Sequence, residues 1–333
     1  MRKFLSISVA AIMAASLLTS CSSVDTVNAG STEDTIEIVT TIFPEYDWVM
    51  NVLGDNPAGA EVTMLLDNGV DLHSYQPTAE DIMKISTCDL FIYVGGESDE
   101  WVEDALLESV NEDMIVINLL DVLGDSVKVE EVVEGMEGEE EEDEGEGEEE
   151  EVEYDEHVWL SLRNASVLVD SIASALETVD EANANTYRSN ASAYIEAINA
   201  LDAEYTQVVE ASSVDTVLFG DRFPFRYLTD DYGLNYYATF VGCSAETEAS
   251  FETISFLAGK VDELSLTTVL TIEGDDHSIA ETIVQNTATG DQQILSLDSM
   301  QSTTSEDVAA GASYLSIMEN NLSVLREALS TEA

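Results

Sequence analysis

The longest uninterrupted helical pattern most constrains the architecture of this chain. Residues 182–212 contain no Gly or Pro and carry apolar side chains at helical intervals. At 1.5 Å per residue such a helix is on the order of 45 Å long, which is longer than a helix within one small domain needs to be. The pattern predicts a linking helix, residues 182–212, between two structural units. Two helices broken near Leu201 are the alternative.

Both flanking halves alternate between strand and helix patterns. In the first half, strands are expected at 36–42, 61–66, 89–94 and 114–118, and helices at 46–53, 78–85, 98–110 and 162–176. In the second half, strands are expected at 216–220, 236–241, 267–273 and 292–297, and helices at 223–232, 250–264, 278–285 and 305–329. Alternation of this kind is typical of parallel sheets covered by helices on both faces. The fold class is therefore predicted as α/β, with two doubly wound lobes at residues 36–181 and 213–333. A long rigid helix joins them, and the ligand cleft lies between them.

The N-terminus has the pattern of an export signal. Arg2 and Lys3 precede an apolar run, residues 4–18, that is too short to anchor a mature protein in a bilayer. Small residues stand directly before Cys21, as in a bacterial lipobox. We expect a lipoprotein signal peptide at 1–20, a polar tether at 21–35, and an extracytoplasmic protein anchored to the bacterial cell membrane through lipidated Cys21. An ordinary signal peptide with an incidental Cys is the alternative.

The charge of the chain restricts its partners. The net charge is -59, with 69 acidic and 10 basic residues. Nucleic acid is excluded as a partner because phosphate binding needs clustered Lys and Arg, whereas cations would be concentrated at such a surface. Of the 27 residues from 130 to 156, 18 are Asp or Glu, so we expect a disordered loop over residues 130–153 that delivers cations to His157. The alternative is that the acidic run only makes the protein more soluble.

Four polar residues fall at or after the ends of predicted strands. They are His73, His157, Asp221 and Asp298. Imidazole and carboxylate groups are ligands for zinc and manganese, and the carboxyl ends of parallel strands meet at one edge of a sheet. Glu273 is a weaker candidate ligand, and His277 is expected to be an exposed residue at a helix start.

The remaining cysteines, Cys88 and Cys243, lie in different halves of the chain. Export would permit a disulfide between them, but such a bond would hinder independent domain motion. We expect two buried thiols without a disulfide; a thiolate metal ligand at Cys243 is an alternative. Trp101 and Trp159 are expected in the core, as large aromatic residues usually are.

Several segments together resemble one protein family. They are Gly69-Val-Asp-Leu-His73-Ser-Tyr-Gln-Pro-Thr78, Asp155-Glu-His157-Val-Trp159-Leu with Arg163-Asn164, Arg226-Tyr227-Leu228 through Tyr232-Gly233-Leu234, and Asp298. This set resembles the metal-binding (cluster 9) substrate-binding lipoproteins of zinc and manganese ABC transporters, over essentially the whole mature chain. The resemblance implies a monomeric receptor that captures a divalent transition metal and delivers it to ABC permease and ATPase subunits without enzymatic activity.

The resemblance also implies four metal ligands. His73 and His157 match the first two and Asp298 the last, but the third position falls on Arg222, which has no lone pair to offer a metal. The neighbouring Asp221 is the predicted substitute, and Arg222 would pair with a ligating carboxylate. Zinc is the expected metal because the acidic loop resembles the accessory loop of zinc-type members; manganese is the alternative.

Two other classes of protein compete with this interpretation. A metal-dependent hydrolase would keep an open coordination position for water, but the chain has no H-E-x-x-H motif. A cell-adhesion protein with a calcium-buffering loop would be expected to show a D-x-D-x-D-G pattern, which the acidic run lacks.

Overall fold

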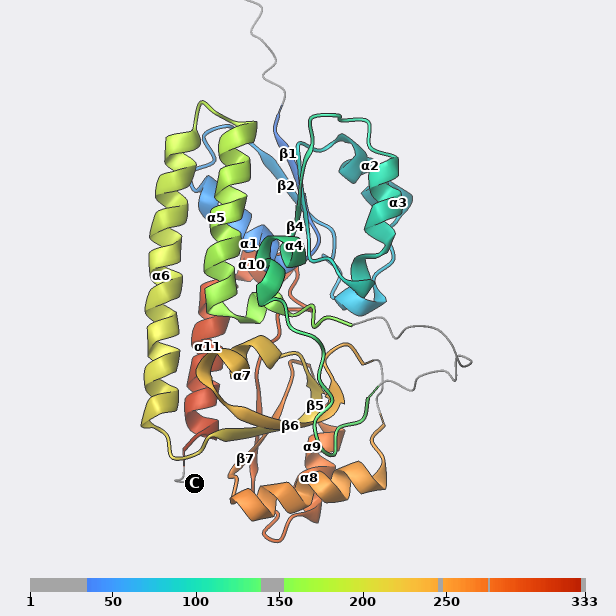
Figure 1. Ribbon diagram of the computed structural model, residues 1–333, viewed down its shortest axis with the longest axis vertical. Coiled ribbons are helices and arrows are strands. Elements are labelled where there is room, and N and C mark those ends of the chain that lie inside the picture. Colours follow the sequence, from blue (N-terminus) through green and yellow to red (C-terminus); the bar gives the residue numbers. More distant parts are fainter. Residues whose placement is uncertain (1–34, 139–152, 245–247, 275, 331–333) are drawn as a thin grey trace, which may run out of the picture. The chain divides into compact units, whose positions relative to one another are not determined.

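Two four-stranded parallel sheets organise the chain (Figure 1). The computed structural model describes residues 35–138, 153–244, 248–274 and 276–330, and residues 35–333 cluster as one unit. The predicted signal peptide, Cys21 and the tether up to residue 34 lie outside the described residues. Among the described helices, none is both long enough and apolar enough to cross a bilayer.

The N-terminal lobe contains the first sheet, with strand order β2-β1-β3-β4. Its strands are β1 (Glu37–Thr40), β2 (Glu61–Met64), β3 (Leu90–Tyr93) and β4 (Ile115–Asn118). The central strands are short apolar runs that are buried almost throughout, as expected for a sheet covered on both faces. The covering helices are α1 (Phe43–Leu53), α2 (Ala79–Thr87), α3 (Trp101–Leu107), α4 (Leu119–Leu123) and α5 (Leu162–Val179).

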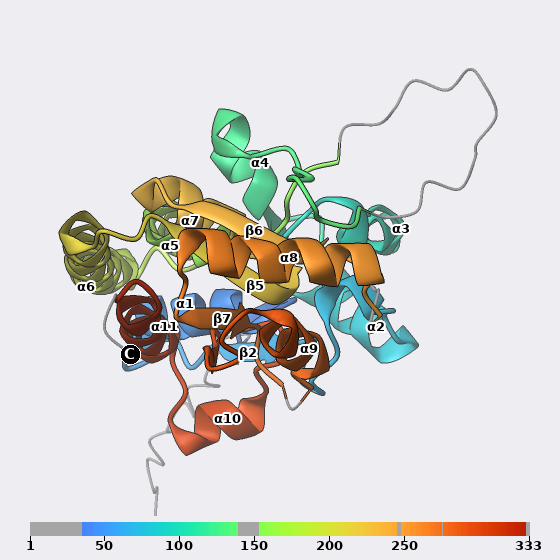
Figure 2. The same cartoon turned by 90° about the horizontal axis from the view of Figure 1, so that it is seen from below.

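The C-terminal lobe contains the second sheet, with strand order β6-β5-β7-β8. Its strands are β5 (Thr216–Phe223), β6 (Asn235–Val241), β7 (Thr268–Thr271) and β8 (Gln293–Ser296), and its helices are α7 (Arg226–Tyr232), α8 (Phe251–Leu264), α9 (Ser278–Asn286), α10 (Ser305–Ala310) and α11 (Tyr314–Ala328). Helices α8 and α9 lie side by side (Figure 2) and share an apolar cluster with β5 and β7, including Leu218, Leu257, Val269 and Ile283. The two predicted α/β lobes are thus confirmed.

Helix α6 (Ala184–Ala211) runs for 28 residues without a break, so the predicted linking helix is confirmed and the alternative of two helices is wrong. The amide of Asn190 donates to the carbonyl of Val52 in α1, 2.9 Å away. The hydroxyl of Tyr205 donates to the carbonyl of Met318 in α11, at 2.7 Å. The helix therefore binds to elements of both lobes and acts as a shared spine (Figure 1).

Two predicted elements are wrong in extent. The expected helix at 305–329 is two helices, because Gly311 ends α10 with a φ of 109°, a left-handed conformation that glycine adopts readily. Strand β5 continues past Gly220 to Phe223, with an irregular register between Phe219 and Arg222. Asp221 and Arg222 therefore lie within the strand and not after it.

The start of the acidic run is ordered against the C-terminal lobe. The backbone N–H of Glu137 donates to the carbonyl of Thr239 at 2.9 Å, and Glu137 forms a parallel bridge with Phe240. Met136 is buried in the core at 8% exposure. The prediction of disorder is wrong for residues 130–138, because apolar side chains among the acids pack inward and the open edge of β6 accepts their backbone. Residues 139–152 lie outside the described residues.

Asp47 is a buried carboxyl that ties α1 to α6. It accepts hydrogen bonds from the Tyr194 hydroxyl at 2.8 Å and the Asn51 amide at 2.9 Å. Burial raises its pKa to about 6. A carboxyl whose folded-state pKa is raised makes the protein less stable as pH rises from its ordinary value of 3.8 through 6.

We expect Asp47→Asn to be more stable than wild type at pH 8 and about equal at pH 4. The gain is about 3 kcal/mol at most, since each pKa unit corresponds to about 1.36 kcal/mol and the amide keeps only one acceptor oxygen. Urea unfolding of both proteins at the two pH values measures it. A stability difference that is the same at both pH values would contradict the assignment to Asp47.

Candidate metal centre

Two histidines from distant parts of the sequence meet in the structure. The Nε2 atoms of His73 and His157 lie 3.2 Å apart. His73 belongs to a short 3-10 helix, Leu72–Ser74, in the loop after β2, and His157 directly precedes another, Val158–Leu160. The Asp71 carboxylate accepts a hydrogen bond from the backbone N–H of His73 at 3.1 Å and so fixes this loop. The fold thus brings the two predicted histidines together, and their role as metal ligands stays a prediction.

His157 is fully buried and is oriented by a carboxylate. Its Nδ1 lies 3.0 Å from Asp155 Oδ1, which also accepts the backbone N–H of His157 at 2.9 Å. Burial lowers the pKa of His157, but the Asp155 and Glu156 carboxylates outweigh it and raise the pKa overall. With Nδ1 at hydrogen-bond distance from a carboxylate, the ring is held with Nε2 facing His73, in the arrangement by which carboxylates orient metal-ligating histidines.

His73 is held from its other nitrogen. Its Nδ1 lies 2.7 Å from the Ser98 hydroxyl and 3.5 Å from a carboxylate oxygen of Glu156. Burial and the neighbouring His157 lower the pKa of His73 to about 3. Two imidazole nitrogens this close cannot both carry a proton, and a neutral imidazole is the form that binds a metal. The pair is therefore organised to share a cation.

A cysteine completes this group from the other lobe. The sulfur of Cys243 and ring nitrogens of His73 and His157 all lie within 4.8 Å of one another. Within the described ranges, no other group of three or more His, Cys, Asp or Glu ligand atoms is this compact. Cys243 follows the end of β6 in the C-terminal lobe, whereas the histidines come from the N-terminal lobe.

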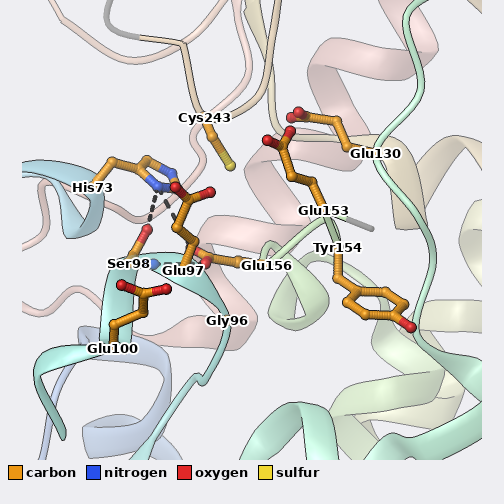
Figure 3. Close-up of a pocket in the computed structure, with 10 residues that line it drawn as sticks. All are labelled: His73, Gly96, Glu97, Ser98, Glu100, Glu130, Glu153, Tyr154, Glu156 and Cys243. Carbon is orange, nitrogen blue, oxygen red and sulfur yellow. Dashed lines mark hydrogen bonds and ion pairs between the residues drawn. The ribbon is translucent and has the colours of Figure 1, made fainter. Parts of the chain in front are cut away.

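Two members of the group, His73 and Cys243, line a cavity of about 390 Å³. Figure 3 shows His73 and Cys243 projecting into it from different segments. Five carboxylates line the same cavity: Glu97, Glu100, Glu130, Glu153 and Glu156. We refer to it as the acidic cavity. Its negative potential raises the local concentration of cations at the imidazole pair.

Arg222 occupies the position where the resemblance implied a third ligand. Its guanidinium donates to Asp71 Oδ2 at 2.8 Å, and that carboxylate lies 3.9 Å from His73 Nε2 through its other oxygen. Asp221 accepts hydrogen bonds from the backbone N–H groups of Arg222 and Ile272, at 2.8 and 3.3 Å. Burial raises its pKa. Asp221 lines a separate cavity of about 440 Å³ beside this ion pair, and it is not a member of the compact three-residue group.

The second predicted carboxylate, Asp298, is also outside the three-residue group. Its Oδ1 accepts the backbone N–H of Met300 at 2.8 Å, and burial together with nearby Glu273 raises its pKa to about 6. Glu273 itself accepts two hydrogen bonds from Ser299, each 2.7 Å long. His277 is half-buried at the start of α9, so the expectation of an exposed residue is wrong, and it is likewise not in the group. Ligation by Asp221 and Asp298 stays a prediction.

The cysteines differ in their surroundings. Cys88 is fully buried in the N-terminal core, as expected, with its sulfur 3.3 Å from the carbonyl of Ile85. Cys243 is half-buried, so the expectation of a buried thiol is wrong for this residue, and neither cysteine forms a disulfide in the described part of the chain. Cys243 follows the carboxyl end of a strand, as His73 does, so the same sequence pattern pointed to both residues. Only the tertiary structure shows that the end of β6 lies beside the two histidines.

Removing the carboxylate behind His157 should weaken metal binding. We expect Asp155→Ala to lower the affinity for divalent metal by about 10–100-fold, the usual cost of losing a partner that orients a ligating histidine. Asp155→Asn keeps an acceptor for Nδ1 and should lose less. Calorimetric titration of both variants decides the order, and equal affinities for all three proteins would show that Asp155 does not support the site.

Comparisons with known proteins identify the family of this chain. The family model "Zinc-uptake complex component A periplasmic" (ZnuA) matches residues 38–328. The zinc-binding lipoprotein AdcA of Streptococcus pneumoniae is 30% identical over 322 residues, which cover 97% of this chain and 60% of AdcA. The high-affinity zinc uptake system protein ZnuA of Bacillus subtilis is 28% identical over 302 residues, covering 91% of this chain and 90% of that protein. This chain thus spans about 60% of the length of the AdcA relatives.

Solved structures show the same fold. The zinc-bound ZnuA-like domain of Streptococcus pneumoniae AdcA is 27% identical, with a TM-score of 0.68 over 89% of this chain and 99% of that one. The metal-dependent lipoprotein YcdH of Bacillus subtilis has a TM-score of 0.71, at 23% identity, over 89% of this chain and 99% of that one. The resemblance noted from the sequence is confirmed: with a family model that matches nearly its whole length, this chain belongs to the ZnuA family.

Proposed function

We propose that this protein is the extracytoplasmic receptor of an ABC importer, which captures zinc and delivers it to the membrane permease. The observation that carries the proposal is the His73–His157 pair, with Nε2 atoms 3.2 Å apart and each Nδ1 held by a protein group. An imidazole pair whose His73 member lines the acidic cavity is suited to trap a cation. The names of the relatives, zinc-binding lipoprotein and zinc uptake protein, support zinc over manganese.

The proposed activity is binding and not catalysis. Ligands supplied by both lobes would couple the capture and release of the metal to the relative position of the lobes. The histidines come from the N-terminal lobe, and the candidates Cys243, Asp221 and Asp298 come from the C-terminal lobe. The binding-protein names of the relatives support this reading over a metal-dependent hydrolase.

The anchoring and the domain limits are also proposals. We propose that Cys21 is lipidated after removal of residues 1–20, which the lipoprotein relatives support, and that residues 21–35 act as a tether. The lobes at 36–181 and 213–333, joined by residues 182–212, would then function as a monomer beside the permease and ATPase subunits.

Metal titration of the purified full chain tests the proposed function. We expect one tight site for Zn²⁺ and weaker binding of Mn²⁺, measured by competition with a chelator of known affinity. Failure to bind Zn²⁺, or a preference for Mn²⁺, would overturn the zinc assignment. Asp221→Ala and Asp298→Ala, measured separately, test the two predicted carboxylates; near-native affinity in either variant removes that residue from the site.

A further inference from the structure

We propose that Cys243 is the third direct ligand, so that the metal centre is a two-histidine, one-thiolate site selective for thiophilic ions. This inference rests on the proposed function as a metal receptor and goes beyond it by specifying the donor set. The sulfur and the two ring nitrogens lie within 4.8 Å of one another, close enough for a single ion to contact all three after small adjustments.

The backbone beside Cys243 is fitted to His157. A Cβ at Gly242 would lie 2.9 Å from Cε1 of His157 and 3.0 Å from the carbonyl of Phe223. Neither neighbour gives way easily, since the ring is fully buried and bonded to Asp155 and the carbonyl is backbone. Glycine at 242 thus permits β6 to end against the imidazole and place the next side chain, Cys243, beside the ligand nitrogens.

Arg222 cannot serve as the third ligand, so another residue must supply it. It stands where a third ligand is implied, but a guanidinium has no lone pair for a metal. Its guanidinium pairs with Asp71 at 2.8 Å and reaches the carbonyl of Ser244, next to Cys243, at 3.5 Å. The residue therefore links the His73 loop to the segment that follows β6, and the ligand comes from that segment.

The donor set determines which metals bind. Thiolate and imidazole suit Zn²⁺, Cd²⁺ and Co²⁺, whereas Mn²⁺ prefers oxygen ligands. A tetrahedral zinc shell that contains His73, His157 and Cys243 has one position left. Only one of the two predicted carboxylates, Asp298 or Asp221, can then join it.

X-ray absorption of the zinc-loaded full chain tests the sulfur ligand without any substitution. We expect one sulfur at about 2.3 Å and nitrogen or oxygen neighbours at about 2.0–2.1 Å, the usual zinc distances for these ligands. A shell of nitrogen and oxygen alone would overturn the assignment of Cys243 while leaving the zinc receptor intact. A protein that binds no zinc would overturn the proposed function itself.

Cobalt substitution identifies which cysteine supplies the sulfur. The Co²⁺ form of the wild type should show sulfur-to-metal charge-transfer absorption in the near ultraviolet, and Cys243→Ser should lose it. Cys88→Ala and Cys21→Ser are matched controls that should keep it. A band that survives in Cys243→Ser, or disappears in a control, would refute the assignment. Unfolding curves of the metal-free proteins show whether each variant is folded.

Selectivity provides an independent measurement. Cys243→Ser should lower the affinity for Zn²⁺ by more than 10-fold and change the affinity for Mn²⁺ little. The preference for Zn²⁺ over Mn²⁺ should therefore decrease. Gly242→Ala keeps the sulfur but displaces it from His157, and should decrease the preference for Zn²⁺ over Mn²⁺ in the same way. An unchanged ratio in both variants would show that the thiolate does not select the metal.

Discussion

Replacing His157 with Ala should remove tight zinc binding. The change deletes a proposed ligand and also removes the imidazole partner of the Asp155 carboxylate, which is 3% exposed and keeps only the backbone N–H of residue 157. A buried carboxylate that loses a hydrogen-bond partner is costly, so we expect the remaining site to reorganise as well. We expect the affinity to fall by more than the 10–100-fold that loss of an outer-shell partner typically costs. Competition titration with a chromophoric chelator measures it.

The other two histidines provide the comparison for that variant. His73→Ala should cause a loss of similar size in zinc affinity, since its Nε2 faces the same point. His277→Ala is the matched control: it lies at the start of α9, outside the compact group, and should bind zinc as the wild type does. Near-native affinity after loss of His73 or His157, or a large loss in the control, would contradict the proposed site.

Replacing Trp159 should reduce the stability of the protein more than the other changes considered. Its side chain is fully buried and packs on the His157 ring, with centroids 5.3 Å apart. Its indole N–H donates to the carbonyl of Ser299 at 2.8 Å, and its own carbonyl accepts the Tyr314 hydroxyl at 2.7 Å. The residue therefore connects the metal centre to the C-terminal lobe, and the prediction that it belongs to the core is confirmed.

We expect Trp159→Ala to lower the free energy of unfolding by about 3–5 kcal/mol, the range for deleting a large buried aromatic side chain. Trp159→Phe keeps much of the ring volume and should cost less, about 1–3 kcal/mol, because the Ser299 carbonyl loses its donor. Urea unfolding of the metal-free proteins measures both. If Trp159→Phe were as unstable as Trp159→Ala, the indole hydrogen bond and not ring packing would dominate.

Local patterns in the sequence determined most of the architecture. The strand and helix alternation in each half, the unbroken run that became α6 and the capping box of Thr78 with Asp81 are all short-range features. Each depends on side-chain periodicity or on hydrogen bonds between near neighbours, which the residue order specifies directly. The two histidines were found in the same way, since each follows a strand pattern and stands in a specific motif.

The tertiary structure alone decided the third member of the metal group. Cys243 is 86 residues from His157 in sequence, and no local spacing relates them. Their approach depends on the end of β6, on Gly242 fitting against the imidazole and on the pairing of Arg222 with Asp71 across 151 residues. The ordered start of the acidic run is a similar case, because composition reports charge but not the open edge of β6 that accepts its backbone. Contacts between distant segments follow from the packing of the whole chain, and one sequence contains no local signal for them.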